Sequence, residues 1–153
     1  MYRPAIGRPR VLLVVSHPSV AAGIETILRL ERRYEVRRAA KLAEAVTIAR
    51  GWPADVALVD ALLLRGGPRA DLGVPALILA GGAAEAAAAE RSVDKPGGWA
   101  AKDAPAADLV SAVERLLTAP SETAAGSLAL FGIGVLLVVL VSLFLYLFWI
   151  AIA

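Results

Sequence analysis

The chain has 153 residues, enough for one ordinary domain and a short extension. Its formal net charge of +2 is too small to indicate a nucleic-acid partner, and the absence of cysteine excludes disulfides and thiol chemistry. The hydrophobic content of 58% is unevenly spread, because every Lys, Arg, Asp and Glu precedes residue 123. We therefore expect a domain that carries all the charge, followed by an uncharged tail.

The sequence of the domain predicts strands that alternate with helices. Residues 1–9 are basic and contain two prolines, so we expect a frayed lead-in, and the domain itself should occupy residues 10–119. Short apolar runs predict buried strands, and apolar residues at helical spacing predict amphipathic helices. The predicted strands lie at 11–15, 34–39, 56–59, 74–80 and 97–102, and the predicted helices at 19–32, 41–50, 83–91 and from about 105 to 117. This alternation is typical of a parallel sheet with helices on both faces.

The third predicted strand delivers a carboxylate, Asp60, directly after the apolar run 56–59. Parallel α/β folds place their ligand crevices at the carboxyl ends of the strands, where Asp60 would lie. The stretch that follows, 64–73, contains three glycines and a proline, so it is too broken to hold a full helix. Asp60 is therefore the first candidate for a functional side chain.

Four stretches of the chain together carry a recognisable pattern. They are R-V-L-L-V-V-S-H-P at 10–18, D-V-A-L-V-D at 55–60, V-P-A-L-I-L-A at 74–80 and G-W-A-A-K-D-A at 98–104. This pattern resembles a response-regulator receiver domain, most closely the NarL/FixJ type, whose first strand ends in D-D-H-P and whose last reads G-Y-L-x-K-D-A. The resemblance spans residues 10–117. It implies a flavodoxin-like (CheY-like), doubly wound α/β fold with a five-stranded parallel sheet in the order 2-1-3-4-5.

The resemblance assigns roles to four residues of this chain. Asp60 matches the phosphoacceptor aspartate, and Lys102 matches the lysine that pairs with the phosphoryl group. Trp99 falls where the family has its switch aromatic. His17 matches the histidine of D-D-H-P, so a separate catalytic role for it is not indicated.

Three other positions depart from the family pattern. Val15 and Ser16 stand where the family has the two acidic residues that hold Mg²⁺, and Ala80 stands where it has a hydroxyl that meets the phosphoryl oxygen. Because Mg²⁺ prefers carboxylate oxygens, we expect its binding to be lost or weak, and with it most phosphoryl transfer. Asp60 and Lys102 then have two readings, namely residual phosphorylation or an ion pair inherited from an active ancestor. We favour the ion pair.

The uncharged tail predicts a membrane helix. Residues 120–127 form a short linker, and residues 128–153 are apolar apart from the hydroxyls of Ser142 and Tyr146. At about 1.5 Å per residue these 26 residues give a helix of roughly 39 Å, which exceeds a hydrocarbon core of about 30 Å. With no signal peptide in the sequence, we expect a single-pass tail anchor in the inner (cytoplasmic) membrane, with the receiver-like domain in the cytoplasm.

The leading hypothesis is a degenerate pseudo-receiver, a non-enzymatic interaction module in signal transduction that is held at the membrane. The partner, a protein or a second copy of the chain, would bind the face that the family usually employs, here 83–91, 98–102 and 108–117. Hydrolase or oxidoreductase chemistry finds no support in a single His, no Cys and no phosphate-cradling Gly loop. Two alternatives stay open: an active phosphorelay regulator phosphorylated on Asp60, and a structural subunit of a membrane complex.

Overall fold

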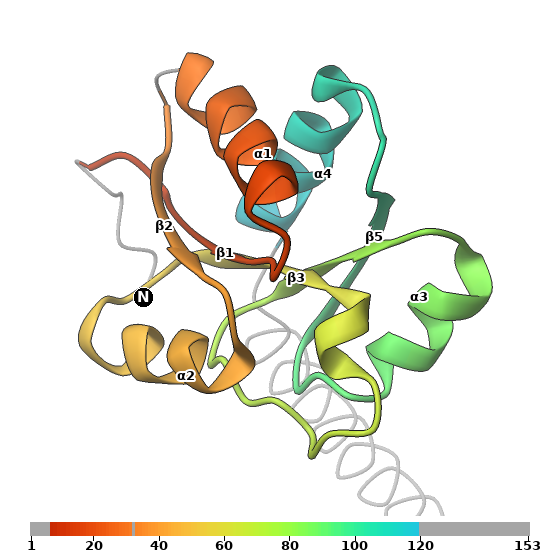
Figure 1. Ribbon diagram of the computed structural model, residues 1–153. Coiled ribbons are helices and arrows are strands. Elements are labelled where there is room, and N and C mark those ends of the chain that lie inside the picture. The colour runs from red at the N-terminus through yellow and green to blue at the C-terminus, as the bar shows by residue number, and fades with distance from the viewer. Residues whose placement is uncertain (1–6, 32, 120–153) are drawn as a thin grey trace, which may run out of the picture. The chain divides into compact units, whose positions relative to one another are not determined.

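The computed structural model describes residues 7–31 and 33–119, which form a five-stranded sheet with helices on both faces (Figure 1). All neighbouring strands are parallel, in the order β2-β1-β3-β4-β5. The strands are β1 (Arg10–Val14), β2 (Glu35–Ala39), β3 (Val56–Asp60), β4 (Ala76–Ala80) and β5 (Pro96–Ala101). The predicted doubly wound sheet and its strand order are therefore confirmed.

The helices divide between the two faces of the sheet (Figure 1). Helices α1 (Pro18–Leu30) and α4 (Ala106–Thr118) pack on one face, and α2 (Leu42–Gly51) and α3 (Ala83–Glu90) pack on the other. Each predicted helix is present, with ends that move by one or two residues. Because the chain runs from β1 to β2 in one direction and then through β3, β4 and β5 in the other, right-handed crossovers place helices on both faces of the sheet.

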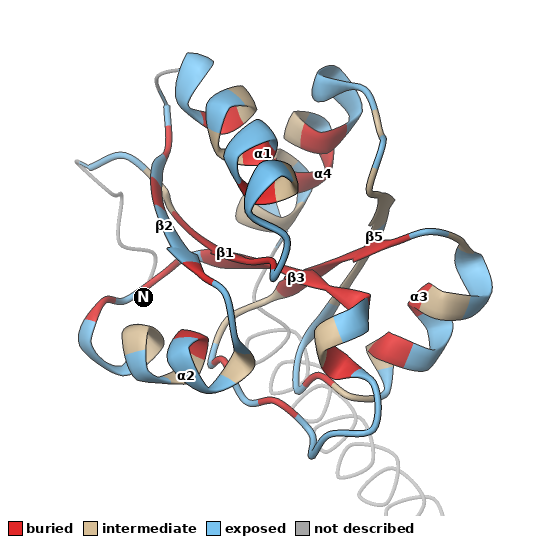
Figure 2. Cartoon of the chain, in the orientation of Figure 1, coloured by how far each residue is buried: buried red, intermediate tan, exposed pale blue. Residues whose placement is uncertain are grey.

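The alternation of side chains along each strand produces two hydrophobic cores. In β1, Leu12 and Val14 face α2 and α3, whereas Val11 and Leu13 face α1 and α4. Because β1, β3 and β4 are covered on both faces, nearly every one of their residues is buried, and they read as continuous apolar runs (Figure 2). The edge strand β2, predicted at 34–39, instead exposes most of its residues.

The crossover from β3 to β4 lacks a full helix. It begins with one turn of 3-10 helix, η1 (Ala61–Leu64), and then continues as an exposed loop. Gly66 and Gly73 in this loop have φ angles of 67° and 70°, a left-handed conformation that other residues rarely adopt. The prediction that 64–73 would not hold a helix is confirmed. The strand predicted at 74–80 begins at Ala76, after Pro75, which has no N–H to offer the ladder.

The predicted tail lies beyond the part of the chain that the structure describes. Within residues 7–31 and 33–119, no helix is long and apolar enough to cross a membrane. The linker expected at 120–127 and the membrane helix expected at 128–153 fall outside those residues, as does most of the lead-in.

Candidate functional site at the carboxyl edge of the sheet

Asp60 is the last residue of β3 and lies at the carboxyl edge of the sheet. It is 5% exposed, and it is the only buried charged or polar residue in the described part of the chain. The apolar residues before it hold β3 between two layers of helices, so the strand carries its terminal carboxylate out of a fully buried core. A carboxylate in this position requires hydrogen-bond donors or a counter-ion.

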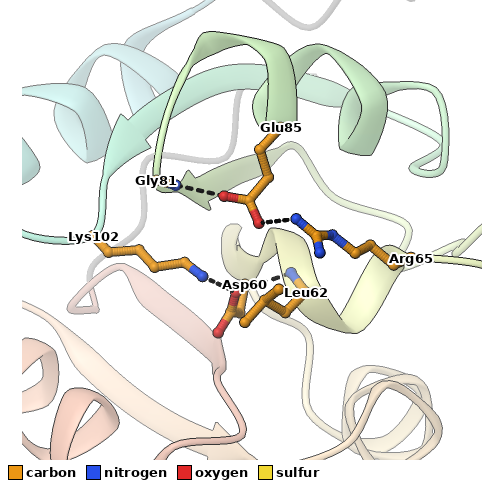
Figure 3. Close-up of polar contacts among 6 residues, drawn as sticks. All are labelled: Asp60, Leu62, Arg65, Gly81, Glu85 and Lys102. Atoms are coloured by element: carbon orange, nitrogen blue, oxygen red, sulfur yellow. Dashed lines mark hydrogen bonds and ion pairs between the residues drawn. The ribbon is translucent and has the colours of Figure 1, made fainter.

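The structure gives Asp60 both a hydrogen-bond donor and a counter-ion (Figure 3). Oδ1 of Asp60 accepts a hydrogen bond from the backbone N–H of Leu62 at 3.0 Å, which caps the first turn of η1. The same oxygen forms an ion pair with Nζ of Lys102 at 2.8 Å. The Asp60 side chain is 7% exposed and that of Lys102 is 28% exposed, so the pair is largely shielded from solvent. The structure thus brings together the predicted phosphoacceptor and phosphoryl-pairing positions.

The position of Lys102 follows from the pairing of β4 with β5. Ala80 is in register with Ala101, and the backbone N–H of Lys102 donates to the carbonyl oxygen of Ala80 at 3.2 Å. This bond fixes the first residue after β5 beside the end of β4, and β4 in turn pairs with β3. The long lysine side chain then spans the mouth of the sheet to reach Asp60.

The three positions that depart from the family pattern lie at the same edge. Val15 directly follows β1 and is 3% exposed, Ser16 is exposed, and Ala80 ends β4 with no exposed surface. Since β3 lies between β1 and β4, these positions flank Asp60 on both sides. They contribute a single hydroxyl and no carboxylate. Among the described residues, no group of three His, Cys, Asp or Glu side chains is arranged to hold a metal ion.

Trp99 and His17 occupy different surroundings. Trp99 lies on β5, opposite Ile78, and is 42% exposed, which is unusual for so large an apolar side chain. It lines a shallow groove between β5 and α4, together with Pro105, Asp108 and Arg115. His17 is exposed, and its Nδ1 lies 2.8 Å from the hydroxyl of Ser19 at the start of α1.

Sequence reasoning missed a second pair of charged side chains, Glu85 and Arg65 (Figure 3). Oε1 of Glu85 lies 2.9 Å from Nη2 of Arg65, and Oε2 accepts a hydrogen bond from the backbone N–H of Gly81 at 2.6 Å. Part of the signal for the second contact was available, because a glutamate at the third position of a helix often reaches back to the N–H of the cap residue, here Gly82, although Glu85 binds the Gly81 N–H one residue earlier. The pairing with Arg65, twenty residues earlier in the chain, has no comparable local signal.

Comparisons with known proteins support the same fold. No family model and no curated protein matches the chain. Among solved structures, a protein described as a response regulator from Chloroflexus aurantiacus is 26% identical with a TM-score of 0.62, over 73% of this chain and 99% of its own. The receiver domain of NarL from Mycobacterium tuberculosis is 21% identical with a TM-score of 0.60, over 74% of this chain and 99% of its own.

A third neighbour is the receiver domain of a sensor histidine kinase from Pseudomonas aeruginosa, described with a magnesium ion in its active-site cleft. It is 21% identical with a TM-score of 0.63, over 74% of this chain and 100% of its own. The described domain has the CheY-like fold that these proteins share. Receiver domains of response regulators are therefore the proteins to which the described domain is similar in fold.

Proposed function

We propose that this protein is a membrane-anchored, degenerate receiver domain that acts as a non-enzymatic interaction module in signal transduction. The observation that carries the proposal is the composition of the carboxyl edge. Asp60 is the only carboxylate among the positions that the family uses, and it is already engaged by Lys102 and the Leu62 N–H. We therefore interpret Asp60 and Lys102 as a structural ion pair.

The donor set at this edge does not fit Mg²⁺. The ion prefers octahedral coordination by oxygen, usually with one or more carboxylates. Val15 supplies no donor, Ser16 only a hydroxyl, and the one carboxylate has a lysine ammonium 2.8 Å from its oxygen. Phosphoryl transfer depends on such an ion to neutralise the charge that develops on the transferred group. We therefore expect Asp60 to be a poor phosphoacceptor.

The proposed partner surface consists of α3, β5 and α4. Exposed residues of α3 are mostly alanine, so this helix offers a smooth surface on which another helix could pack closely. The exposed Trp99 on β5 adds a large aromatic side chain, a residue type enriched at protein interfaces. The partner would be another protein or a second copy of the chain.

The tail sequence completes the proposal. An anchor formed by residues 128–153 would confine the domain to the surface of the inner membrane and raise its concentration relative to other membrane-bound proteins. A contact that is weak in solution could then be occupied.

The alternative is an active phosphorelay regulator, and the retained pair favours it. A buried aspartate at the end of β3 with a lysine 2.8 Å away is what a phosphoacceptor and its phosphoryl-pairing residue would require. Under this alternative, Lys102 would leave the carboxylate and pair with the phosphoryl oxygens.

Phosphorylation of the full chain in a mild detergent separates the two functions. The protein would be incubated with Mg²⁺ and acetyl phosphate and analysed by mass spectrometry under conditions that preserve acyl phosphates. We expect no phosphate on the wild type, whereas a variant with the family residues restored (V15D/S16D/A80T) should gain it, provided its circular dichroism spectrum shows that it is folded. Phosphate on wild-type Asp60 that disappears in D60N would overturn the proposal.

A further inference from the structure

A second ion pair, between Glu85 and Arg65, lies near the pair of Asp60 and Lys102 (Figure 3). The Glu85 carboxylate binds the Gly81 N–H with one oxygen and the Arg65 guanidinium with the other. The Glu85 side chain is 18% exposed and that of Arg65 is 66% exposed, so the contact is shielded from solvent on the carboxylate side. The three groups come from the end of β4, the start of α3 and the loop after η1.

The strand register places this pair at the mouth of the site. Leu79 is in register with Asp60, and Ala80 is in register with Ala101. Gly81 is therefore the first residue after β4, just beyond these two pairs. Gly81 directly follows Ala80, whose carbonyl oxygen accepts from the Lys102 N–H at 3.2 Å. Figure 3 shows the Glu85 carboxylate between Gly81 and Arg65, in the same view as the Asp60–Lys102 pair.

Helix capping alone does not account for the arrangement. Glu44 makes the same local contact at the start of α2, where its Oε2 accepts from the Ala40 N–H at 2.9 Å. In the part of the chain that the structure describes, however, Glu44 has no ion-pair partner. It also follows β2, at the outer edge of the sheet and two strands away from Asp60. Glu85 differs by its bond to Arg65 and by its place beside the site.

The charges at the mouth cancel. Asp60 and Glu85 contribute two negative charges, and Lys102 and Arg65 contribute two positive charges, each in an ion pair. An incoming oxyanion would therefore find the cations already paired and the Gly81 N–H already donating. It would also approach a carboxylate that repels it.

We propose that Glu85 is a built-in anion that closes this site: its carboxylate takes the N–H and the guanidinium that an external phosphate or phosphoryl group would need. The proposal rests on the degenerate-receiver function and explains how the site would be kept shut. It also implies that the loop between β4 and α3 is held in one conformation, because Glu85 ties it to the chain that follows Asp60. The exposed surface of α3, which follows this loop, would then stay in one orientation and remain available to a partner.

The test is a titration of the full chain, in a mild detergent, with inorganic phosphate. Binding is monitored by NMR through the backbone amide signals of Leu62, Gly81 and Lys102. Wild type should show no saturable shift at millimolar phosphate. E85A should bind with an affinity at least about tenfold higher, which corresponds to one like-charge contact of about 1.4 kcal/mol. E44A loses the matching contact between a glutamate and a backbone N–H before a helix, here that of Ala40, and should behave as wild type.

Two further variants locate the gained site. E85Q, which keeps the shape and an amide oxygen, should also gain binding, because the charge is removed. The double variant R65A/E85A should lose the gain, since Arg65 supplies the cation. Identical titrations of wild type and E85A, with or without binding, would overturn the role of Glu85, as would equal gains in E85A and E44A.

Failure of this test is distinct from failure of the proposed function. The phosphate titration involves no phosphoryl transfer, and a D60N background removes the phosphoacceptor without touching Gly81 or Arg65. Phosphorylation of wild-type Asp60 would overturn the degenerate-receiver function. An E85A titration without saturable amide shifts would instead show that the contacts of Glu85 with Gly81 and Arg65 have only a structural role.

Discussion

Replacement of Lys102 by methionine tests whether the Asp60–Lys102 ion pair holds the domain together. The substitution keeps most of the side-chain volume but removes the ammonium that lies 2.8 Å from Oδ1 of Asp60. The carboxylate, 7% exposed, would keep one hydrogen bond from Leu62 and lose its counter-ion.

The expected loss follows from the exposure of the two partners. Removal of one member of a fully buried pair costs about 3–5 kcal/mol, because a buried charge is left uncompensated. The Lys102 side chain is 28% exposed, so water can enter and screen the remaining charge. We expect K102M to lower the free energy of unfolding by about 2 kcal/mol and D60N by about 1 kcal/mol, since Lys102 can turn toward solvent. The double variant should lose about 2 kcal/mol rather than the sum.

Urea unfolding of the full chain in a mild detergent measures these losses, with tryptophan fluorescence as the signal, to which the buried Trp52 contributes. The matched control is K95M, because Lys95 is exposed and its Nζ donates to the Gly73 carbonyl oxygen, at 3.3 Å, rather than to a carboxylate. It should change stability by no more than about 0.5 kcal/mol. A K102M loss no larger than that of K95M, or a double variant whose loss equals the sum, would refute the ion pair as a stabilising contact.

Two predictions concern the amino ends of the strands, away from the site at the carboxyl edge of the sheet. G97A should destabilise the domain by about 1–3 kcal/mol in the same assay, because a Cβ at Gly97 would lie 2.5 Å from Cδ2 of Leu116 and 3.3 Å from the Ala76 carbonyl oxygen. G23A, in a helix and with nothing within 4 Å, should stabilise it instead, and equal effects would contradict the packing. Burial raises the pKa of Tyr34 above its ordinary 10.0, aided by the Glu114 carboxylate that its hydroxyl contacts at 3.4 Å. Because the folded state then holds this proton more tightly than the unfolded state, the contribution is complete below pH 10 and is lost as the pH rises through the folded pKa. The melting temperature of wild type should therefore fall more steeply above pH 10 than that of Y34F, and parallel curves would exclude this role.

Much of the fold could be predicted from the chain because its central strands are short, apolar and covered on both faces. The runs that end at Val14, Asp60 and Ala80 identify themselves by composition alone. The resemblance supplied the strand order, which no local pattern specifies. Strand and helix ends were less certain, because they depend on which backbone groups find partners, as at Pro75.

The site was predictable to the extent that each residue directly follows a strand. Asp60 ends β3 and Lys102 directly follows β5, with β4 between these two strands, so a parallel sheet must bring them to one edge. The pairing of Arg65 with Glu85 depends on the path of the loop between β3 and β4, which is set by glycine conformations and by the missing helix. The exposure of Trp99 likewise depends on the register of β5 against β4, which shifts between Ala76 and Ile78.

The short crossover between β3 and β4 also provides a place for labels. At its tip, Gly66, Gly67 and Pro68 are exposed, and a Cβ added at either glycine would meet nothing within 4 Å. Loop tips of this kind tolerate insertions and new chain ends better than helices or strands. An epitope or a fluorophore-binding tag inserted after Gly67 would lie near α3, because Gly66 lines a pocket together with Ala84 and Ala88, but it would leave β5 and α4 uncovered. The crossover thus offers a way to follow the protein in cells with the β5 and α4 part of its candidate partner surface intact.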